Sequence, residues 1–547
     1  MNRFAALLDR LAYEPSRLGK LRLMTDYFRQ VGDPDRGFAL AALTGALSFR
    51  LAKPALIRTL IYERVDPVLF DLSYDFVGDL SETVALLWPG KPDEKSGPPP
   101  RLAQVIETLE GASKLDLPGV LARLLDALDE TGRWALLKLI TGALRVGVSA
   151  RLAKQAVAEL GGHSANDIED LWHGLAPPYL DLFAWIEGRE ERPNPDDPAR
   201  FCPAMLAHAV TEKDLVALTP ADFAAEWKWD GIRVQAAVGE GPQGKIIRLY
   251  SRTGEDISAA FPDLIDGLAR VPFKSFSLDG ELLILRGGRV QAFGVLQQRL
   301  NRKQVTSPLL VDFPAHIRAY DLLALDGADL RALPFAERRQ KLEAFVAGAA
   351  MDRLDLSPEV AFAAWDDLAA ARLDPASAGA GDDAAAVEGV MIKRRDSVYV
   401  PGRPKGLWYK WKRDPFAVDA VLMYAQRGHG KRSSFYSDFT FGVWRAGTGG
   451  DELVPVGKAY FGFTDEELRL LDRYVRNHTT NRFGPVREVA YGKEDGLVLE
   501  IAFEGLNRSS RHKSGVAMRF PRINRIRWDK PAREADRLET LERLIIA

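Results

Sequence analysis

The short stretch around Lys228 holds the first candidate for chemistry in this sequence. Lys228 stands between Trp227 and Trp229, and Asp230-Gly231, typical of a tight turn, follows at once. A lysine acts as a nucleophile only when its amine is unprotonated, and desolvation and nearby positive charge both favour that form. Strand alternation points both tryptophans away from the face of Lys228. Taken alone, the stretch favours a structural role for Lys228 over a catalytic one. Its aliphatic stem would pack on a half-buried strand, and its ammonium group would remain in water.

Charged residues downstream supply the other groups that a nucleotide-transfer site needs. Glu281 lies next to a glycine in the alternating stretch SLDGELLIL, and Glu388 opens the segment EGVMIK. Lys410 and Lys412 share one side of the strand-like segment WYKWK. Each of these residues by itself is typical of a solvated charge. Together they provide carboxylates for Mg²⁺, cations for phosphate oxygens and a lysine to attack the α-phosphorus.

The elements that must position these residues differ along the chain. Residues 1 to about 185 show leucine and alanine at helical spacing, with Ser149 as an expected helix N-cap. The charged, proline-containing segment 187–200 is typical of a linker. From residue 201, short alternating stretches and Gly/Pro turns predict strands mixed with helices. After about residue 414, further strand-like runs dominate. We therefore expect a helical domain, a mixed α/β domain and a small, largely β domain.

The composition narrows the class of protein. The chain has 547 residues and a formal net charge of −2, so any surface for a polyanion must come from local clustering of basic residues. Cys202 is the single cysteine, which excludes an intrachain disulfide and a cysteine-based zinc site. No apolar run approaches the length of a membrane span, and the N-terminus lacks the apolar core of a signal peptide. We expect a cytoplasmic protein with no membrane association.

A set of motifs in fixed order resembles the covalent nucleotidyltransferases, and most closely the ATP-dependent DNA ligases. The motifs are KWDGIR (228–233), SRTGE (251–255), LDGE (278–281), YDLLALDG (320–327), EGVMIK (388–393) and WYKWK (408–412). Three flanking segments are similar to the same family: 134–160 to the helical DNA-binding domain of the longer ligases, CPAMLAH (202–208) to the lead-in of their adenylation domain, and RFPRINRIRWDK (519–530) to the last motif of their OB-fold.

The resemblance implies a fold and an activity. It implies an all-α DNA-binding domain over 1–190, an α+β nucleotidyltransferase domain, ATP-grasp-like, over 201–414, and an OB-fold β-barrel over 415–547. The implied enzyme seals 5′-phosphate/3′-hydroxyl nicks in duplex DNA, as a monomer. Lys228 would take AMP from ATP as a phosphoramidate and pass it to the 5′-phosphate, and the 3′-hydroxyl would then displace it. In a bacterial cell such an enzyme would work on the nucleoid.

The resemblance also implies roles for individual residues. Glu226 would read the adenine, and Tyr320 would stack on it in place of the usual phenylalanine, because tyrosine keeps the ring. Glu281 would bind the ribose or the metal, and Glu388 would bind the catalytic Mg²⁺, with Mn²⁺ as an alternative. The expected contacts to sugar and phosphate are Arg233, Arg252, Lys393, Lys410 and Lys412. One further contact would come from either Arg403 or Lys405, because Pro404 stands where the family often has arginine. The last motif would bring Arg525, Arg527, Asp529 and Lys530 over the pyrophosphate.

Basic residues gather where a DNA backbone could be bound. Residues 504–530 contain eight Lys/Arg and two acidic residues. Such clusters contact phosphates with an affinity that falls as salt rises. In the helical region the candidate backbone contacts are Lys138, Arg145, Arg151 and Lys154, for which ordinary solvated helix faces are an equal alternative.

Other readings of the motifs compete with a DNA ligase. RNA ligases and messenger-RNA capping guanylyltransferases share the lysine motif, but the long helical region and Glu226 favour a DNA ligase. NAD-dependent DNA ligases normally carry a four-cysteine zinc module, which one cysteine excludes. A catalytically dead DNA-binding protein would have a decayed site, whereas the lysines and both carboxylates are present here.

Overall fold

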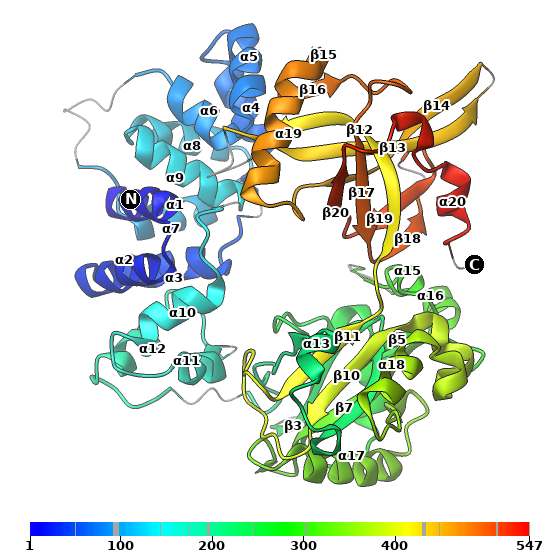
Figure 1. The fold of residues 1–547 in the computed structure, drawn as a ribbon. Coiled ribbons are helices and arrows are strands. Elements are labelled where there is room, and N and C mark those ends of the chain that lie inside the picture. Colours follow the sequence, from blue (N-terminus) through cyan, green and yellow to red (C-terminus); the bar gives the residue numbers. More distant parts are fainter. Residues whose placement is uncertain are drawn as a thin grey trace. The chain divides into compact units, whose positions relative to one another are not determined.

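The computed structural model describes the chain except for residues 50, 91–97, 143, 173, 194–196, 243, 301, 303–304, 429–433, 448, 510–511 and 546–547. The chain divides into two compact units, which we describe separately (Figure 1). The first unit combines Met1–Ile168, Ala176–Pro193 and Pro415–Ala547, and the second combines Glu169–Leu175 and Asn194–Asp414. Within the described ranges, no helix has both the length and the apolar character needed to span a membrane.

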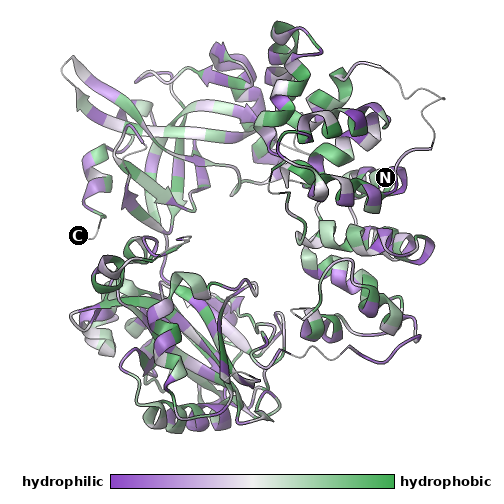
Figure 2. Ribbon diagram, turned by 180° about the vertical axis from the view of Figure 1, so that it is seen from behind, coloured by the Kyte–Doolittle hydropathy of each residue, from purple (hydrophilic) through white to green (hydrophobic). Residues whose placement is uncertain are grey.

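The region 1–190, which belongs to the first unit except for Glu169–Leu175, is helical, as the leucine and alanine spacing predicts. The described residues of 1–190 contain helices and no strand. The helices are α1 (Asn2–Tyr13), α2 (Arg17–Gln30), α3 (Asp35–Thr44), α4 (Pro54–Tyr62), α5 (Pro67–Val77), α6 (Leu80–Leu87), α7 (Leu102–Gly111), α8 (Leu117–Asp126), α9 (Glu130–Thr141), α10 (Ala150–Ala158), α11 (Ala165–Trp172) and α12 (Leu180–Ile186). Ser149 caps α10 as expected, because its Oγ accepts a hydrogen bond from Leu152 N at 3.2 Å. Hydrophobic and hydrophilic colour alternates along these helices in Figure 2, as amphipathic helices require.

The second unit is built on two sheets. A four-stranded sheet has the order β1-β11-β10-β2, and a seven-stranded sheet has the order β4-β3-β5-β7-β8, with β6 beside β5 and β9 beside β7. The strands are β1 (His208–Ala209), β2 (Phe223–Trp229), β3 (Ile232–Gly241), β4 (Gly244–Ser251), β5 (Phe276–Arg286), β6 (Arg289–Val290), β7 (Ala315–Leu325), β8 (Ala328–Asp329), β9 (Leu354–Leu356), β10 (Val387–Arg394) and β11 (Trp408–Lys412). The helices are α13 (Glu212–Leu215), α14 (Pro262–Ala269), α15 (Phe293–Leu296), α16 (Ser307–Asp312), α17 (Phe335–Ala349) and α18 (Trp365–Leu373).

Alternation along β2 separates an apolar face from a polar one. Phe223, Ala225, Trp227 and Trp229 are buried in one hydrophobic cluster with residues of β10 and β11. Glu226 and Lys228 therefore point to the opposite face of the same sheet. The tryptophans on either side of Lys228 serve packing, as strand alternation predicts.

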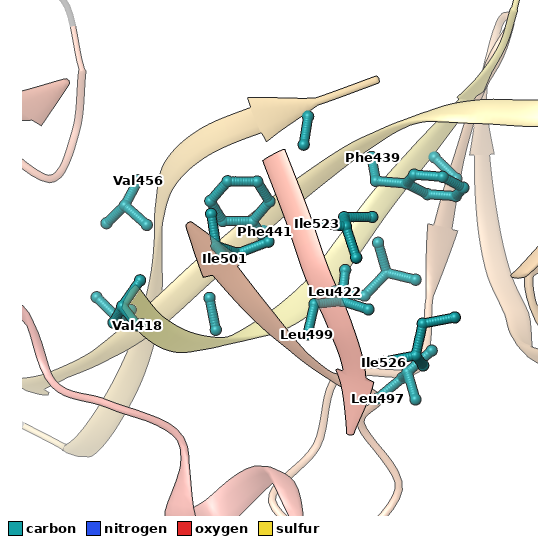
Figure 3. Packing of buried hydrophobic residues seen from close by; sticks show 14 of the residues in the cluster. Val418, Leu422, Phe439, Phe441, Val456, Leu497, Leu499, Ile501, Ile523 and Ile526 are labelled. Carbon is teal, nitrogen blue, oxygen red and sulfur yellow. The ribbon is translucent and has the colours of Figure 1, made fainter. Parts of the chain in front are cut away.

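The C-terminal part of the first unit is a curled, strand-rich, OB-like domain. Its elements are β12 (Phe416–Arg427), β13 (Tyr436–Gly447), β14 (Gly450–Ala459), α19 (Asp465–His478), β15 (Thr479–Phe483), β16 (Val486–Val489), β17 (Val498–Phe503), β18 (Gly505–Arg508), β19 (Val516–Arg519), β20 (Arg522–Arg527) and α20 (Leu538–Glu542). The long strand β12 pairs with β13, β16 and β17, which bends the sheet around one core. Figure 3 shows this core, where Leu422, Phe441 and Ile501 pack together. The expected fold class is confirmed.

Candidate active site

A β-bulge places Glu388 against Lys228. In the pairing of β10 with β2, Val387 lies opposite Trp229 and Val390 lies opposite Trp227. Two residues of β10, Glu388 and Gly389, therefore face the single residue Lys228, which is the pattern of a bulge. Because the extra residue resets the alternation, Val387 and Val390 both keep to the apolar face while Glu388 turns to the polar one. Lys228 Nζ donates a hydrogen bond to Glu388 Oε1.

Gly389 is what allows the bulge. Its φ is +143°, a backbone conformation that side chains rarely adopt. A Cβ at this position would lie 2.3 Å from the carbonyl oxygen of Trp411 on the neighbouring strand. The glycine of EGVMIK is thus required by geometry, and through it the position of Glu388 depends on close contact between β10 and β11.

Glu388 is shared between two lysines. Its Oε2 lies 3.3 Å from Lys412 Nζ, while Oε1 binds Lys228. Burial by itself raises the pKa of a carboxyl group, but the charges and hydrogen bonds of Lys228 and Lys412 outweigh burial and lower the pKa of Glu388. Glu388 is therefore ionised at neutral pH.

Glu281 comes to the site from the other sheet. The turn Asp230-Gly231 joins β2 of the four-stranded sheet to β3 of the seven-stranded sheet, and β3 pairs with β5, which carries Glu281. A Cβ on Gly231 would lie 2.7 Å from Glu281 Cγ, so the glycine allows the close approach. Burial raises the pKa of Glu281 to about 8 against the opposing effect of Lys228, and the negative charge of Glu388 adds to the rise.

Glu226 lies in a buried ion-pair cluster on the same face of β2 as Lys228. Its Oε1 accepts a hydrogen bond from Arg339 Nη1 at 3.0 Å, and its Oε2 accepts one from Lys393 Nζ at 2.8 Å. Lys393 Nζ also donates to the carbonyl oxygen of Tyr320 at 3.3 Å and lies 4.6 Å from the centre of its ring. Lys393, expected with Lys410 and Lys412 at the phosphates, is instead placed beside Glu226 and Tyr320.

Arg233 is held by a second buried network. Its Nη2 pairs with Asp279 Oδ2 and donates to Tyr399 Oη at 3.0 Å, and its Nη1 donates to the carbonyl oxygen of Met205. Tyr399 Oη in turn donates to Asp279 Oδ2 at 2.6 Å. Burial alone lowers the pKa of an arginine, but the negative charge of Asp279 raises the pKa of Arg233. The guanidinium is therefore always charged, and its hydrogen bonds to Asp279, Tyr399 and the Met205 carbonyl oxygen fix its orientation.

The remaining predicted cations lie close enough together to affect one another. Burial lowers the pKa of Lys410, and the positive charges of Lys412, Lys228, Arg403 and Arg252 lower it further. Arg403 and Arg252 are exposed, whereas Lys410 and Lys412 are half-buried. This arrangement is a concentration of positive charge around Lys228, suited to a polyphosphate.

The last motif forms its own network in the C-terminal domain. Arg527 Nη1 and Lys530 Nζ lie 3.1 Å and 2.8 Å from the same carboxylate oxygen, Asp419 Oδ2. Arg527 also pairs with Asp529 at 2.9 Å. Arg525 lies on β20 and is exposed.

The sequence reading missed several supporting residues. Asp279 could have been found, because it lies two residues before Glu281 and alternation puts both on one face of β5. Arg339, Tyr399 and Asp419 gave no local signal, because their partners are distant in the chain. In the helical region, Lys138 is buried and pairs with Asp79 at 2.6 Å, and Lys154 is buried too. Arg145 and Arg151 are exposed, so only these two keep the surface position that a backbone contact needs.

Comparison with known proteins connects this site to a family. The family model described as ATP dependent DNA ligase domain matches residues 204–412, and that described as ATP dependent DNA ligase C terminal region matches residues 432–530. A probable DNA ligase from Koribacter versatilis is 34% identical over 436 residues, which cover 75% of this chain and 71% of that protein. A probable DNA ligase from Anaeromyxobacter dehalogenans is 30% identical over 98% of this chain and 97% of its own length. The solved structure named Pmar-Lig_PreS3 shares the fold, with a TM-score of 0.58 at 15% identity over 96% of this chain and 99% of that chain.

Proposed function

The chain belongs to the family of ATP-dependent DNA ligases, and on that premise we propose that Lys228 is the residue that carries AMP. The family seals nicks through a lysyl-AMP intermediate. The attacking amine forms a P–N bond with the α-phosphorus of ATP, the bond to pyrophosphate breaks, and the amine loses its proton. AMP then passes to the 5′-phosphate of the nick, and the 3′-hydroxyl displaces it. The observation that carries the assignment is the hydrogen bond of Lys228 to Glu388 among clustered cations.

Each neighbouring group has a task in this scheme. Lys410, Lys412, Arg252 and Arg403 would neutralise phosphate oxygens, because positive charge fixed in a half-buried site stabilises a developing anion. Arg233, held by Asp279 and Tyr399, would contact the ribose or a phosphate. Tyr320 would stack on the adenine, and Glu226 would accept a hydrogen bond from its amino group. Arg525, Arg527 and Lys530 would act on the pyrophosphate during the first step.

Glu281 and Glu388 would hold the Mg²⁺ that the family implies. Among the described residues no cluster of three or more His, Cys, Asp or Glu side chains could hold a metal alone. Two carboxylates are nevertheless enough, because Mg²⁺ is usually bound by one or two carboxylates together with substrate phosphates and water. Burial first, and then the negative charge of Glu388, raises the pKa of Glu281, and a bound cation would offset both effects. When bound, the ion supplies positive charge against the phosphate oxygens; Mn²⁺ is an alternative.

The proposed substrate is nicked duplex DNA, bound by a monomer with three domains over 1–190, 201–414 and 415–547. The exposed arginines of the helical region and the basic residues of 504–530 support contacts to DNA phosphates. Repair, replication and recombination are roles typical of the family. We place the work of the enzyme on chromosomal DNA in the cytoplasm, on the nucleoid if the source is bacterial.

The test is covalent labelling. Incubation with ATP labelled at the α-phosphate and Mg²⁺ should leave a label on the protein, with none from labelled GTP and none on Lys228→Ala. The labelled enzyme should then seal nicked DNA in preference to nicked RNA. A label that survives in Lys228→Ala would show that another residue carries the AMP, and sealing of RNA alone would redirect the assignment to an RNA ligase.

A further inference from the structure

Both carboxylate oxygens of Glu226 accept hydrogen bonds from buried side chains. Its side chain is only 2% exposed, and each of its two oxygens receives a hydrogen bond from a cationic group, Arg339 or Lys393. Arginine and lysine can donate hydrogen bonds but cannot accept them. One lone pair of each carboxylate oxygen is therefore used in accepting from a cation. Each oxygen keeps a second lone pair, which can accept from a donor but cannot pair with another acceptor.

Arg339 is itself held in place on its far side. Its Nη2 donates to the carbonyl oxygen of Ser357 at 2.7 Å, and Ser357 Oγ accepts a hydrogen bond from Trp229 Nε1 at 3.1 Å. Its Nε lies 3.2 Å from Glu343 one turn along α17. The guanidinium fork therefore joins α17, the Ser357 segment and β2, and it leaves Glu226 little freedom to rotate.

The environment of Lys393 places an aromatic ring beside the same carboxylate. Lys393 Nζ lies 4.6 Å from the ring centre of Tyr320, 4.8 Å from that of Phe335 and 4.9 Å from that of Trp408. A flat ring next to a fixed acceptor is the combination that recognises a base bearing an amino group. A 6-amino purine presents a donor at this point, whereas a 6-oxo purine presents an acceptor.

We propose that Arg339 is the positioning residue through which the enzyme selects adenine: by binding Glu226 Oε1 it holds the carboxylate as an acceptor aimed at the 6-amino group of the base. This inference rests on the proposed adenylation of Lys228 and assigns the specificity of that step. Arg339 does not touch the nucleotide and acts only through Glu226. Without the hydrogen bond from Arg339, the carboxylate of Glu226 can rotate. The enzyme then discriminates less strongly against bases that lack a 6-amino group.

The experiment compares three nucleotides on the full-length enzyme. ATP has a 6-amino group, inosine triphosphate has a 6-oxo group, and purine riboside triphosphate has neither. For wild type, kcat/KM of self-adenylation should be highest with ATP. In Arg339→Lys and Arg339→Gln, the preference for ATP over purine riboside triphosphate should fall by about tenfold or more, the scale of one hydrogen bond to a charged group. The ratio of the two kcat/KM values, measured on one protein sample, does not depend on the fraction of the protein that is folded.

The adjacent arginine of α17 provides the matched control. Arg338 is buried as well, but its guanidinium binds Asp321 at 2.8 Å and 2.9 Å and does not bind Glu226. Arg338→Lys should lower the thermal unfolding midpoint and leave the nucleotide preference unchanged. Equal losses with all three nucleotides in the Arg339 variants would overturn the inference and leave a structural role. An unchanged preference in Glu226→Gln would overturn it as well, while labelling of Lys228 in that variant would leave the proposed function standing.

Discussion

Lys228 on β2 and Glu388 on β10 are hydrogen-bonded where β10 contributes two residues against one. The two residues are 160 positions apart in the chain. This contact depends on the β-bulge in β10. The second residue of the bulge is Gly389, and any other amino acid at this position would strain the backbone.

The bulge can be tested at its glycine. Gly389→Ala adds a Cβ that meets the Trp411 carbonyl oxygen at a positive φ, so β10 must shift and Glu388 must leave Lys228. We expect self-adenylation to fall by about a hundredfold or more, the scale on which misplaced catalytic groups lose rate. Gly379→Ala is the control, because its φ is also positive but nothing lies within 4 Å of the added Cβ. Similar losses in both variants would mean that backbone strain alone explains the effect.

Removing the charge of Glu388 should weaken both metal use and adenylation. Glu388→Gln keeps the shape of the side chain but leaves Lys228 and Lys412 without their shared carboxylate. We expect a lower rate of self-adenylation and a higher Mg²⁺ concentration for half-maximal rate. Titration of Mg²⁺ in a labelling assay measures both. A variant with an unchanged Mg²⁺ requirement would remove Glu388 from the metal site.

Glu281 should make stability depend on pH in the absence of metal. Its pKa is raised from 4.5 to about 8 in the folded protein, so between these values the folded state holds a proton that the unfolded state has lost. Stability from this group is therefore full below about pH 4.5 and is lost as pH rises toward 8. Thermal unfolding in EDTA from pH 5 to 8 should show a steeper fall for wild type than for Glu281→Gln. Parallel curves would contradict the raised pKa.

Asp419 should contribute to self-adenylation, the first step of the reaction, and contribute little to the final sealing step. Asp419 binds Arg527 and Lys530 through one oxygen, so Asp419→Asn removes the negative charge that the two cations share, while Arg527 keeps its pair with Asp529. We expect self-adenylation to fall by about tenfold, the scale of one lost hydrogen bond to a charged group. Sealing of DNA that already carries the 5′-adenylate should be nearly unchanged. Asp451→Asn, which removes an exposed ion pair to Arg537 in the same domain, is the control.

The helical region should bind DNA through exposed rather than buried cations. Replacing Arg145 and Arg151 together with alanine should weaken binding of nicked DNA and reduce the slope of log affinity against log salt by about one for each lost phosphate contact. Self-adenylation, which needs no DNA, should be unchanged. Lys138→Ala should instead lower stability, since it leaves Asp79 half-buried without its partner. An unchanged salt slope in the double variant would exclude these arginines from the interface.

The order of motifs, the helical and strand-rich regions and the alternation that puts Glu226 and Lys228 on one face of β2 could all be predicted from the sequence. Those features are local: they depend on periodicity, on turn residues and on short segments whose spacing is visible along the chain. They were enough for the family and the fold class, both of which are confirmed, and for the candidate nucleophile Lys228, which stays a prediction.

Only the tertiary structure decided which charges meet. Lys393 lies on β10, just as Lys410 and Lys412 lie on β11, yet it pairs with Glu226 beside the ring of Tyr320. Lys138 and Lys154 look like a solvated helix face and are buried. Arg339 reaches Glu226 over 113 positions, and the bulge at Glu388 shows only in strand register. The physical reason is that ion pairing and burial depend on neighbours brought together by folding, and local pattern carries no record of them.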